Sequence, residues 1–467
     1  MSQPPNASLT TAAARQALAR EVRRLAIPAI LNSLLQTMVF VVDRAMLGHH
    51  AETSLAGMQV AGPIEWSLWS VFMAFEVGTI ARVGRHVGAR DPERTRRAAI
   101  LSLGIAAAAG LFVAVASPAV TPLLGRMFSR ASPAAVDAAQ SYLVWTLSAS
   151  PVVFVSATAI ASLTAGGDAR TPLAIGIGVN VFHIALNRVL ILGALGVPAM
   201  GMAGAGISTT VTFTLEAAFT VAALFRRGRP VSLRRVPGAA PGDSAAYLSE
   251  AKALQRIANP AVLERILYHV GYLGYVVVLG RLGDAPMAAN QSLISVESIC
   301  FLSADGFGLA AAALVAQKLG AGLPGEATRA AKISARYAIV LLTTMGLLFL
   351  ALRAVVLPVF SNDPEVIAIG AAAVPVLAFA QPFMATATVL AQSLRGAGMT
   401  RPVLAVSAVC AFAVRIACTW LFAITFGLGL TGVWVGSTCD WVVRSVLLVW
   451  LGRVKAREAT RASPSPS

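Results

Sequence analysis

Long apolar stretches separated by short polar segments run along almost the whole chain. A helix needs about 20 predominantly apolar residues to cross the hydrocarbon core of a bilayer. Stretches of that length recur twelve times, so the pattern predicts an all-α membrane protein with twelve transmembrane helices. The expected spans are residues 26–47, 58–81, 98–121, 141–164, 172–194, 203–225, 259–280, 288–316, 332–357, 368–393, 402–425 and 430–452.

The second half of this pattern repeats the first at one offset. Pro28 and Pro260 occupy matching places, which gives an offset of 260 − 28 = 232, and the same shift relates Glu65 to Glu297. Because each half contains an even number of spans, both copies enter the membrane in the same direction. We therefore expect two pseudo-symmetric six-helix bundles related as parallel repeats, an architecture that supports alternating access.

The polar segments between the spans give the expected domain boundaries. The chain divides into an N-terminal tail, an N-lobe with helices 1 to 6, a linker, a C-lobe with helices 7 to 12, and a C-terminal tail. These parts are residues 1–25, 26–225, 226–257, 258–452 and 453–467, respectively.

Arginines concentrate in both tails, in the linker and in the segment after the second span, whereas the alternate loops contain few. By the positive-inside rule both termini and the linker are expected in the cytoplasm, with the protein in the inner or plasma membrane. The net charge of +16 is then an orientation signal and predicts no nucleic-acid partner. A composition that is 57% hydrophobic and 12% charged, with mean hydropathy +0.73, also excludes a soluble domain. Membrane lipids are expected partners, and we expect a monomer.

Polar residues within the spans are the candidates for function, because an ionisable group at bilayer depth is costly unless it faces a cavity or a partner. In the first span, Asn32, Gln36 and Asp43 lie within about 40° of one another on a helix. Asn32 and Gln36 could form a hydrogen-bonded seam between helices instead, which leaves Asp43 as the leading candidate. His183 and Asn187 lie one turn apart in the fifth span. A histidine in such a place is either a satisfied hydrogen-bonding residue or a proton carrier.

The matching stripe in the seventh span contains a carboxylate and tyrosines. Glu264, Tyr268 and Tyr275 each lie 232 residues after a member of the first stripe, and Tyr272 lies beside them. A carboxylate with an aromatic wall suits a lipophilic cation. The alternatives are an interfacial aromatic belt or a packed helix face, and Arg265 could neutralise Glu264.

Six further carboxylates lie in expected spans, and buried carboxylates can exchange protons near physiological pH. They are Glu65 and Glu76 in the second span, Glu216 in the sixth, Glu297 and Asp305 in the eighth and Asp440 in the twelfth. We expect some of these groups to be paired with intramembrane arginines and the others to line a substrate cavity.

The chain contains no phosphate loop, no HExxH pair and no GxSxG elbow, which argues against ATP-driven pumping and against common membrane hydrolases. Its four cysteines lie in expected spans without metal-ligand spacing, so neither a metal nor another cofactor is expected. The pattern therefore favours a transporter over an enzyme.

Eight short motifs, taken in order, carry a resemblance to a known family. They are RLAIP at 24–28, DRAMLG at 43–48, GARD at 88–91, GGDAR at 166–170, AANQ at 288–291, LGAG at 319–322, LRGAG at 394–398 and TGVW at 431–434. With this order and spacing, residues 20–455 resemble the multidrug and toxic compound extrusion (MATE) family of secondary transporters. The resemblance implies export of diverse, often cationic amphiphiles in exchange for inward H⁺ or Na⁺.

The resemblance also implies an N-lobe site around the first-span aspartate, here Asp43, with Gln36 two turns before it and Thr209 matching a sixth-span threonine. The Asn and Asp that the family carries in the fifth span align with His183 and Asn187. Asp43 thus lacks its usual second carboxylate, and the relay is either impaired or rebuilt around His183. An acidic residue of sodium-coupled relatives has no counterpart in residues 381–384, which favours protons.

Our leading expectation is a proton-coupled multidrug antiporter that works by alternating access. In this hypothesis Asp43 takes up a proton from outside, the first span repacks and affinity for the exported compound falls. One alternative is a flippase for lipid-linked precursors, which needs a wide cationic cavity. The other is an intramembrane enzyme, for which no catalytic constellation is present.

Overall fold

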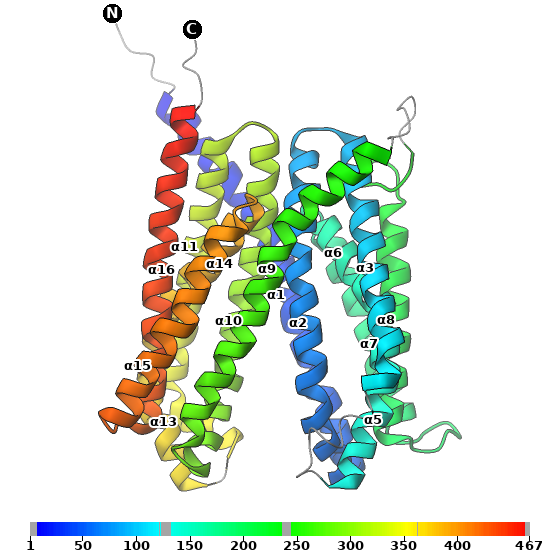
Figure 1. Cartoon of the computed structure of the whole chain (residues 1–467), viewed down its shortest axis with the longest axis vertical. Helices are drawn as coiled ribbons and strands as arrows, with labels where there is room; N and C mark the ends of the chain where they lie inside the picture. The colour runs from blue at the N-terminus through cyan, green and yellow to red at the C-terminus, as the bar shows by residue number, and fades with distance from the viewer. Residues whose placement is uncertain (1–6, 121, 123–131, 236–243, 362, 463–467) are drawn as a thin grey trace, which may run out of the picture. The chain divides into compact units, whose positions relative to one another are not determined.

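The computed structural model of the protein describes residues 7–120, 122, 132–235, 244–361 and 363–462. This part of the chain contains helices and no strands (Figure 1). Nine of its helices are long and apolar enough to cross a membrane, and one bent pair of helices could form a tenth span. Two further expected spans fall on the long helices α1 (Ala7–His50) and α2 (Glu52–Gly88). The expectation of an all-α membrane protein is confirmed.

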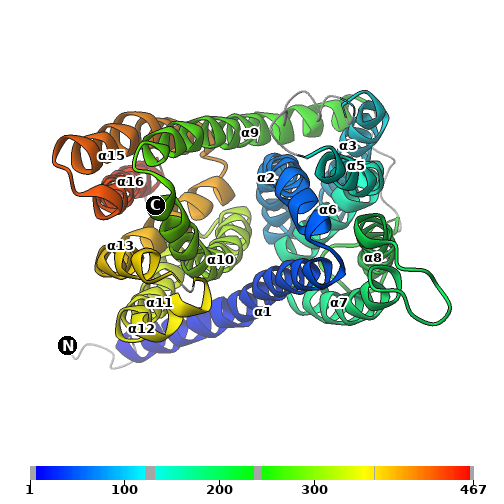
Figure 2. The same cartoon turned by 90° about the horizontal axis from the view of Figure 1, so that it is seen from below.

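The helices pack into two units. The N-lobe unit is Leu31–Ala258, and the C-lobe unit combines Met1–Ile30 with Asn259–Ser467. Besides α2, the N-lobe unit contains α3 (Pro92–Val120), α5 (Pro133–Ser148), α6 (Ser150–Ala165), α7 (Arg170–Leu190) and α8 (Gly201–Leu224). The C-lobe unit contains α10 (Asp284–Gly320), α11 (Pro324–Ala351), α12 (Arg353–Val356), α13 (Pro364–Gly396), α14 (Thr400–Ala408), α15 (Ala417–Trp420) and α16 (Gly429–Ala462). Within the C-lobe unit, α13 packs against α10, α11 and α16 (Figure 2).

Two helices each belong to both units. The first, α1, leaves the C-lobe unit after Ile30, two residues beyond Pro28. The second, α9 (Ser244–Gly280), leaves the N-lobe unit after Ala258, two residues before Pro260. A proline inside a helix lacks the N–H that would close the preceding turn, so both crossings lie beside a natural bend point.

These crossings move the expected lobe boundaries. Residues 26–30 were expected in the N-lobe but pack in the C-lobe unit, and residues 244–258 were expected as linker but form the first turns of α9 in the N-lobe unit. Periodicity along the chain could not detect this exchange, because each of these segments continues a helix whose remaining part lies in the other unit.

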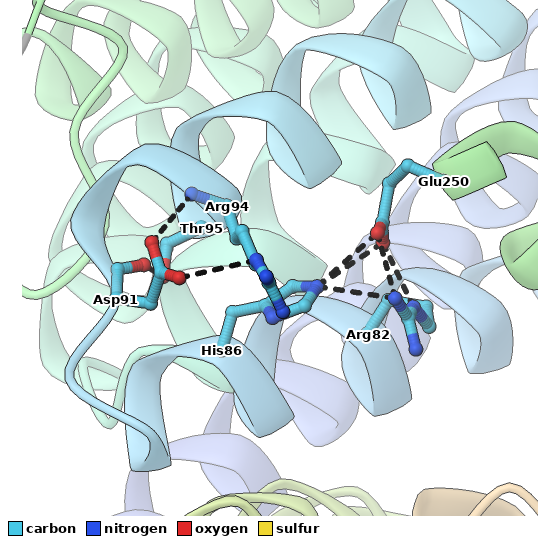
Figure 3. A network of polar contacts seen from close by, with 6 residues as sticks. All are labelled: Arg82, His86, Asp91, Arg94, Thr95 and Glu250. Carbon is cyan, nitrogen blue, oxygen red and sulfur yellow. Dashed lines mark hydrogen bonds and ion pairs between the residues drawn. The ribbon is translucent and has the colours of Figure 1, made fainter. Parts of the chain in front are cut away.

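Ion pairs hold the N-terminal parts of α1 and α9, the two crossing helices that belong to both units. In the N-lobe unit, the Glu250 carboxylate of α9 accepts hydrogen bonds from Arg82 Nε at 2.8 Å and Nη2 at 2.6 Å, and His86 Nε2 lies 3.2 Å away (Figure 3). In the C-lobe unit, Glu21 of α1 pairs with Lys318 Nζ at 3.1 Å. His86 and Lys318 are 318 − 86 = 232 positions apart. The duplication therefore places a basic residue at the same site in both halves, and in each half this residue binds a carboxylate of the crossing helix.

Two expected spans are not single straight α-helices. The fourth consists of α5 and α6, which meet at 54°. Pro151 is the second residue of α6, and it cannot donate the hydrogen bond that would continue α5. The eleventh span contains two π-helical segments, Val409–Ile416 and Leu421–Thr425, on either side of α15. Such wider turns are rare and often mark functional positions, and the first of them carries Arg415.

Small residues allow close contact between helices, as is usual in membrane bundles. A Cβ atom added to Gly396 of α13 would lie 2.3 Å from the backbone oxygen of Ala312 on α10. Backbone atoms cannot rotate away from such a contact, so the two helices would have to separate. By contrast, Gly104 of α3 has no atom within 4 Å of an added Cβ.

We expect Gly396→Ala to destabilise the protein by about 1–3 kcal/mol, the usual range for overpacking. Thermal unfolding of the purified protein in detergent, monitored by size-exclusion chromatography, measures this loss of stability. Gly104→Ala is the matched control and should be neutral or stabilising by up to about 1 kcal/mol, because alanine has the higher helix propensity. Equal unfolding temperatures for the two variants would contradict the expectation.

Candidate functional site

The N-lobe unit contains a buried polar cluster centred on Asp43. His183 Nε2 lies 3.0 Å from Asp43 Oδ1 and 3.1 Å from Oδ2. Asn187 Nδ2 donates a 2.6 Å hydrogen bond to Asp43 Oδ1 and lies 3.0 Å from His183 Nε2. The exposed fractions of Asp43, His183 and Asn187 are 9%, 3% and 0%. The structure thus brings together three of the five residues that the sequence indicated in the first and fifth spans.

Hydroxyl groups of α8 contact the other side of the imidazole. His183 Nδ1 lies 2.9 Å from Thr212 Oγ1 and 3.2 Å from Ser208 Oγ. The Thr212 hydroxyl donates a 2.8 Å hydrogen bond to the backbone oxygen of Ser208, so its own oxygen can accept a hydrogen bond from Nδ1–H. Ser208 can donate to Nδ1 when that nitrogen carries no proton. His183 therefore has suitable partners both as a neutral imidazole and as an imidazolium.

Local sequence explains why these groups meet. His183 and Asn187 lie four residues apart on α7, and Ser208 and Thr212 lie four residues apart on α8, so each pair projects from one helix face. The two helices pack directly against each other. Asp43 comes one turn before Leu47, which begins a buried apolar cluster. Other members of this cluster are Met58, Leu143, Ile191 and Met202.

A second polar group lies nearby on α2, α5 and α8. The Tyr142 hydroxyl donates a 2.9 Å hydrogen bond to Glu65 Oε2, and Thr209 forms a hydrogen bond with the same hydroxyl. Tyr142 is buried, with 3% of its surface exposed. The charged side chains that act electrostatically on Glu65 are Asp43 and Arg44. Glu65, expected among substrate-cavity residues, therefore lies close enough to interact with the Asp43 cluster.

The other two members of the first-span stripe are placed differently. Asn32 is half-buried, and its Oδ1 lies where a Cβ at Gly176 of α7 would come within 2.9 Å. Asn32 Oδ1 therefore packs closely against α7 at Gly176. Gln36 continues α1, but its side chain lies outside the described part of the structure.

In the C-lobe unit, Glu264 is paired and hydrogen-bonded. Its Oε1 lies 2.6 Å from Arg395 Nη2 and accepts a 2.5 Å hydrogen bond from Ser407. The sequence had suggested Arg265 as the neutralising charge, whereas the direct partner is Arg395, on α13. An engaged carboxylate is poorly suited to bind a cation, so this pair differs from the expected open face.

The three tyrosines of α9 lie in different surroundings. Tyr275 donates a 2.8 Å hydrogen bond to Asn290 Oδ1, and its ring stacks on Tyr272 with centroids 5.7 Å apart. Tyr268 has the Arg265 guanidinium 5.8 Å from its ring centroid. The charged groups acting on Tyr272 and Tyr275 are Arg415 and Glu297. The carboxylate associated with these two tyrosines is therefore Glu297, from α10.

Two further C-lobe carboxylates, Asp305 and Asp440, also have partners. Gln392 Nε2 donates to Asp305 Oδ1 at 2.8 Å. Asp440, which is fully buried, lies 2.9 Å from Arg415 Nε and 2.8 Å from Arg444 Nη2. Both guanidinium groups also lie over the Trp441 ring, 5.7 and 5.4 Å from its centroid. Asp440 thus holds two arginines within the bundle.

The sequence of this chain matches a known protein family over most of its length. The sequence model of the MatE family matches residues 28–189 and 260–421. The chain belongs to the MatE family. One matched segment begins at Pro28 and the other at Pro260. Their starts are 260 − 28 = 232 positions apart and their ends 421 − 189 = 232 positions apart, which confirms the duplication. Membership places the protein among the MATE multidrug efflux transporters and not among enzymes.

Individual relatives resemble the chain over nearly its full length. It is 27% identical over 431 residues to the probable multidrug resistance protein NorM of Thermotoga maritima. The aligned region covers 92% of this chain and 90% of that relative. A multidrug resistance MATE family transporter of the MOP superfamily, solved in an outward-facing conformation, matches with TM-score 0.86 and 18% identity over 95% of this chain and 97% of that chain. A MOP superfamily transporter from Pyrococcus furiosus matches with TM-score 0.84 and 19% identity over 95% and 97%. The reverse polarity of the binding pocket of that transporter suggests a different function for it.

Among the members of these networks that sequence reasoning missed, four carry hydroxyl groups. They are Tyr142, Ser208, Thr212 and Ser407. Ser208 and Thr212 flank Thr209 at helical spacing, which could have indicated a polar face on the sixth span. Tyr142 and Ser407 carried no comparable signal, because single hydroxyl groups are common in membrane helices.

Proposed function

We propose that this MATE protein exports amphiphilic organic cations from the cytoplasm in exchange for protons, with Asp43 and His183 as the proton site. The observation that supports this most directly is the buried contact between the carboxylate and an imidazole that has partners in both protonation states. An ionisable pair inside a membrane bundle needs such partners to change charge without leaving a polar atom unsatisfied.

The chemistry of the cluster favours H⁺ over Na⁺. Sodium is a hard cation and is bound best by oxygen ligands. Here the groups that contact the Asp43 carboxylate are nitrogens, His183 Nε2 and Asn187 Nδ2. A sodium ion would have to displace both, whereas a proton can be held between the carboxylate and the imidazole.

Protonation must bias two conformations differently to drive exchange. Asp43 lies in the part of α1 that belongs to the N-lobe unit, and its carboxylate ties α1 to α7. Protonation of Asp43 would weaken this tie and let α1 repack, with Pro28 and Pro260 as the bend points between units. In this proposal the cation leaves on the outside when the proton binds, and both chain termini are cytoplasmic in the inner or plasma membrane.

In the C-lobe unit, we propose that Glu297, Tyr268, Tyr272 and Tyr275 contact the exported cation, with Asp305 nearby on α10. Charge balance argues against a phosphate-bearing cargo such as a lipid-linked precursor. Arg415 and Arg444 are engaged by Asp440, and Arg395 is engaged by Glu264. These arginines therefore offer little free positive charge for a phosphate group.

Reconstituted transport tests the proposal. We expect purified protein in proteoliposomes to move ethidium, a fluorescent lipophilic cation, when a pH gradient is imposed, with a rate at least about tenfold above a sodium gradient of equal size. Proton movement should accompany ethidium movement. Transport driven only by sodium, or movement of a lipid-linked sugar phosphate in place of ethidium, would overturn the proposal.

A further inference from the structure

The N-lobe unit contains a second carboxylate that interacts electrostatically with Asp43, and it comes from α2 and not from the fifth span. We propose that Glu65 of α2 is a second proton-accepting group of the N-lobe, linked to the Asp43 cluster through Tyr142 and Thr209. This inference rests on the proposed proton-coupled function and extends it to a residue on another helix. Glu65 would thereby replace the second carboxylate that the family carries in the fifth span, where this chain has Asn187.

Hydrogen bonds connect Glu65 to the helix that carries the His183 partners. Tyr142 donates to Glu65 Oε2 at 2.9 Å and is hydrogen-bonded to Thr209. Thr209 is the neighbour of Ser208, whose hydroxyl lies 3.2 Å from His183 Nδ1. The helices involved, α2, α5 and α8, pack on one another, α5 directly against both of the others. Proton uptake at Glu65 therefore changes the hydrogen bonding of Thr209 on α8, the helix that also carries the His183 partners Ser208 and Thr212.

The direction of this chain depends on the charge of Glu65. An ionised carboxylate only accepts hydrogen bonds, so the Tyr142 hydroxyl must point its proton toward it. A protonated carboxyl can donate, and Tyr142 would then turn its own proton toward Thr209. Protonation thus reverses the donor order along Glu65, Tyr142 and Thr209, which gives Tyr142 a role that phenylalanine could not fill.

Electrostatics couples the two carboxylates. The groups that act on Glu65 are Tyr142 from α5 and Asp43 and Arg44 from α1. Two carboxylates at interacting distance in a poorly polar interior repel each other when both are ionised. With His183 neutral, Asp43, Glu65 and Arg44 together carry one net negative charge. One proton neutralises this charge, so protonation of either carboxylate changes the net charge of the N-lobe cluster.

The duplication provides an independent observation. Glu297 occupies the matching position in the C-lobe unit, 297 − 65 = 232 residues later, and there too the carboxylate acts on tyrosines. In that unit the neighbouring positive charge is Arg415. Each half of the molecule thus places a carboxylate and tyrosine hydroxyls inside its bundle. The halves differ in the charged neighbours of that carboxylate, which are Asp43 and Arg44 for Glu65 and Arg415 for Glu297.

The test measures protons released when ethidium binds to the purified protein in weakly buffered detergent solution, together with the pH profile of ethidium affinity. We expect Glu65→Gln to lower the proton release by about half and to reduce the pH profile from two coupled steps to one. Glu65→Asp keeps a titrating carboxylate and should retain two steps. If Glu65→Gln keeps the proton release and pH profile of the unmodified protein, the inference is overturned.

Further variants separate this inference from a structural role and from the proposed function. Glu216→Gln is the matched control, because Glu216 is also buried in the N-lobe unit and accepts a 2.9 Å hydrogen bond from Ser156. It should leave the proton release unchanged. Equal losses in Glu65→Gln and Glu65→Asp would mean that Glu65 is only structural. Where Glu65→Gln does not fold, Tyr142→Phe decides, since an unchanged pH profile in that variant would also overturn the inference.

Asp43→Asn distinguishes the two levels of the argument. If Asp43→Asn abolishes proton release and Glu65→Gln does not change it, the proton-coupled function stands and the role of Glu65 falls. If neither variant changes proton release, the proposed function itself falls.

Discussion

Asp43→Asn should abolish ethidium efflux driven by a pH gradient while the protein remains folded. Asparagine has nearly the same shape and still accepts a hydrogen bond from Asn187, but it cannot take up a proton. His183 also loses the negative charge that faces its Nε2 at 3.0 Å. We expect the efflux rate to fall by about 100-fold, which corresponds to about 2.7 kcal/mol in the activation barrier. Initial rates in proteoliposomes of known orientation provide the measurement.

The matched control for this experiment is Asp91→Asn. Asp91 lies outside the buried cluster, where it accepts a 2.9 Å hydrogen bond from the Arg94 backbone and pairs with the Arg94 side chain (Figure 3). Asparagine caps helices about as well as aspartate, so transport should persist. An Asp43→Asn protein that transports as fast as the unmodified protein under the same pH gradient would rule out the proton site.

Asp440→Asn should produce the largest loss of stability among the carboxylates of the C-lobe unit. Asp440 is fully buried and pairs with both Arg415 and Arg444, so its neutralisation leaves two guanidinium groups within the bundle without their carboxylate. Breaking one partner out of a buried ion pair typically costs about 3–5 kcal/mol. Thermal unfolding in detergent, read by size-exclusion chromatography, should show a large decrease in the unfolding temperature.

Two further variants make this result specific. Glu326→Gln removes an ion pair with Lys318 in which the Glu326 side chain is 42% exposed, and it should cost no more than about 1 kcal/mol. Adding Arg415→Met to Asp440→Asn removes one of the two unpaired charges and should recover part of the lost stability. The reason is that the effects of substitutions within one interacting network on the free energy of unfolding are not additive. An Asp440→Asn protein as stable as the Glu326→Gln protein would contradict the importance of this network.

The N-lobe cluster was predictable to the extent that its members share helix faces. Asp43 stood out as an ionisable residue in an apolar span, and the four-residue spacing of His183 and Asn187 placed them on one face of α7. Their mutual contact was not predictable from spacing, because the rotation of α1 against α7 depends on packing. Glu65 shows the same limit, since its relation to Asp43 arises from the approach of α2 to α1 and α5.

Partners in the C-lobe unit were less accessible to sequence reasoning. Glu264 forms its direct ion pair with Arg395, which lies 131 residues later, whereas its neighbour Arg265 adds only a weaker electrostatic interaction. Neighbouring residues on a helix point in different directions, so adjacency in sequence says little about which charges meet. The tyrosines of α9 were likewise grouped with Glu264 by their common stripe, whereas the carboxylate that acts on Tyr272 and Tyr275 is Glu297.

The sequence by itself determined that this protein is an all-α membrane protein made of two repeated halves, and its motifs indicated the MATE family. These properties are local or periodic: a span is defined by its length and apolarity, and a duplication by its constant register. Only the tertiary structure decided that α1 and α9 each pass from one unit into the other, that Asp43 meets His183, and which arginine binds each C-lobe carboxylate. The physical reason is that these features depend on how helices distant in sequence rotate and pack, and side-chain contacts between helices leave no periodic trace along the chain.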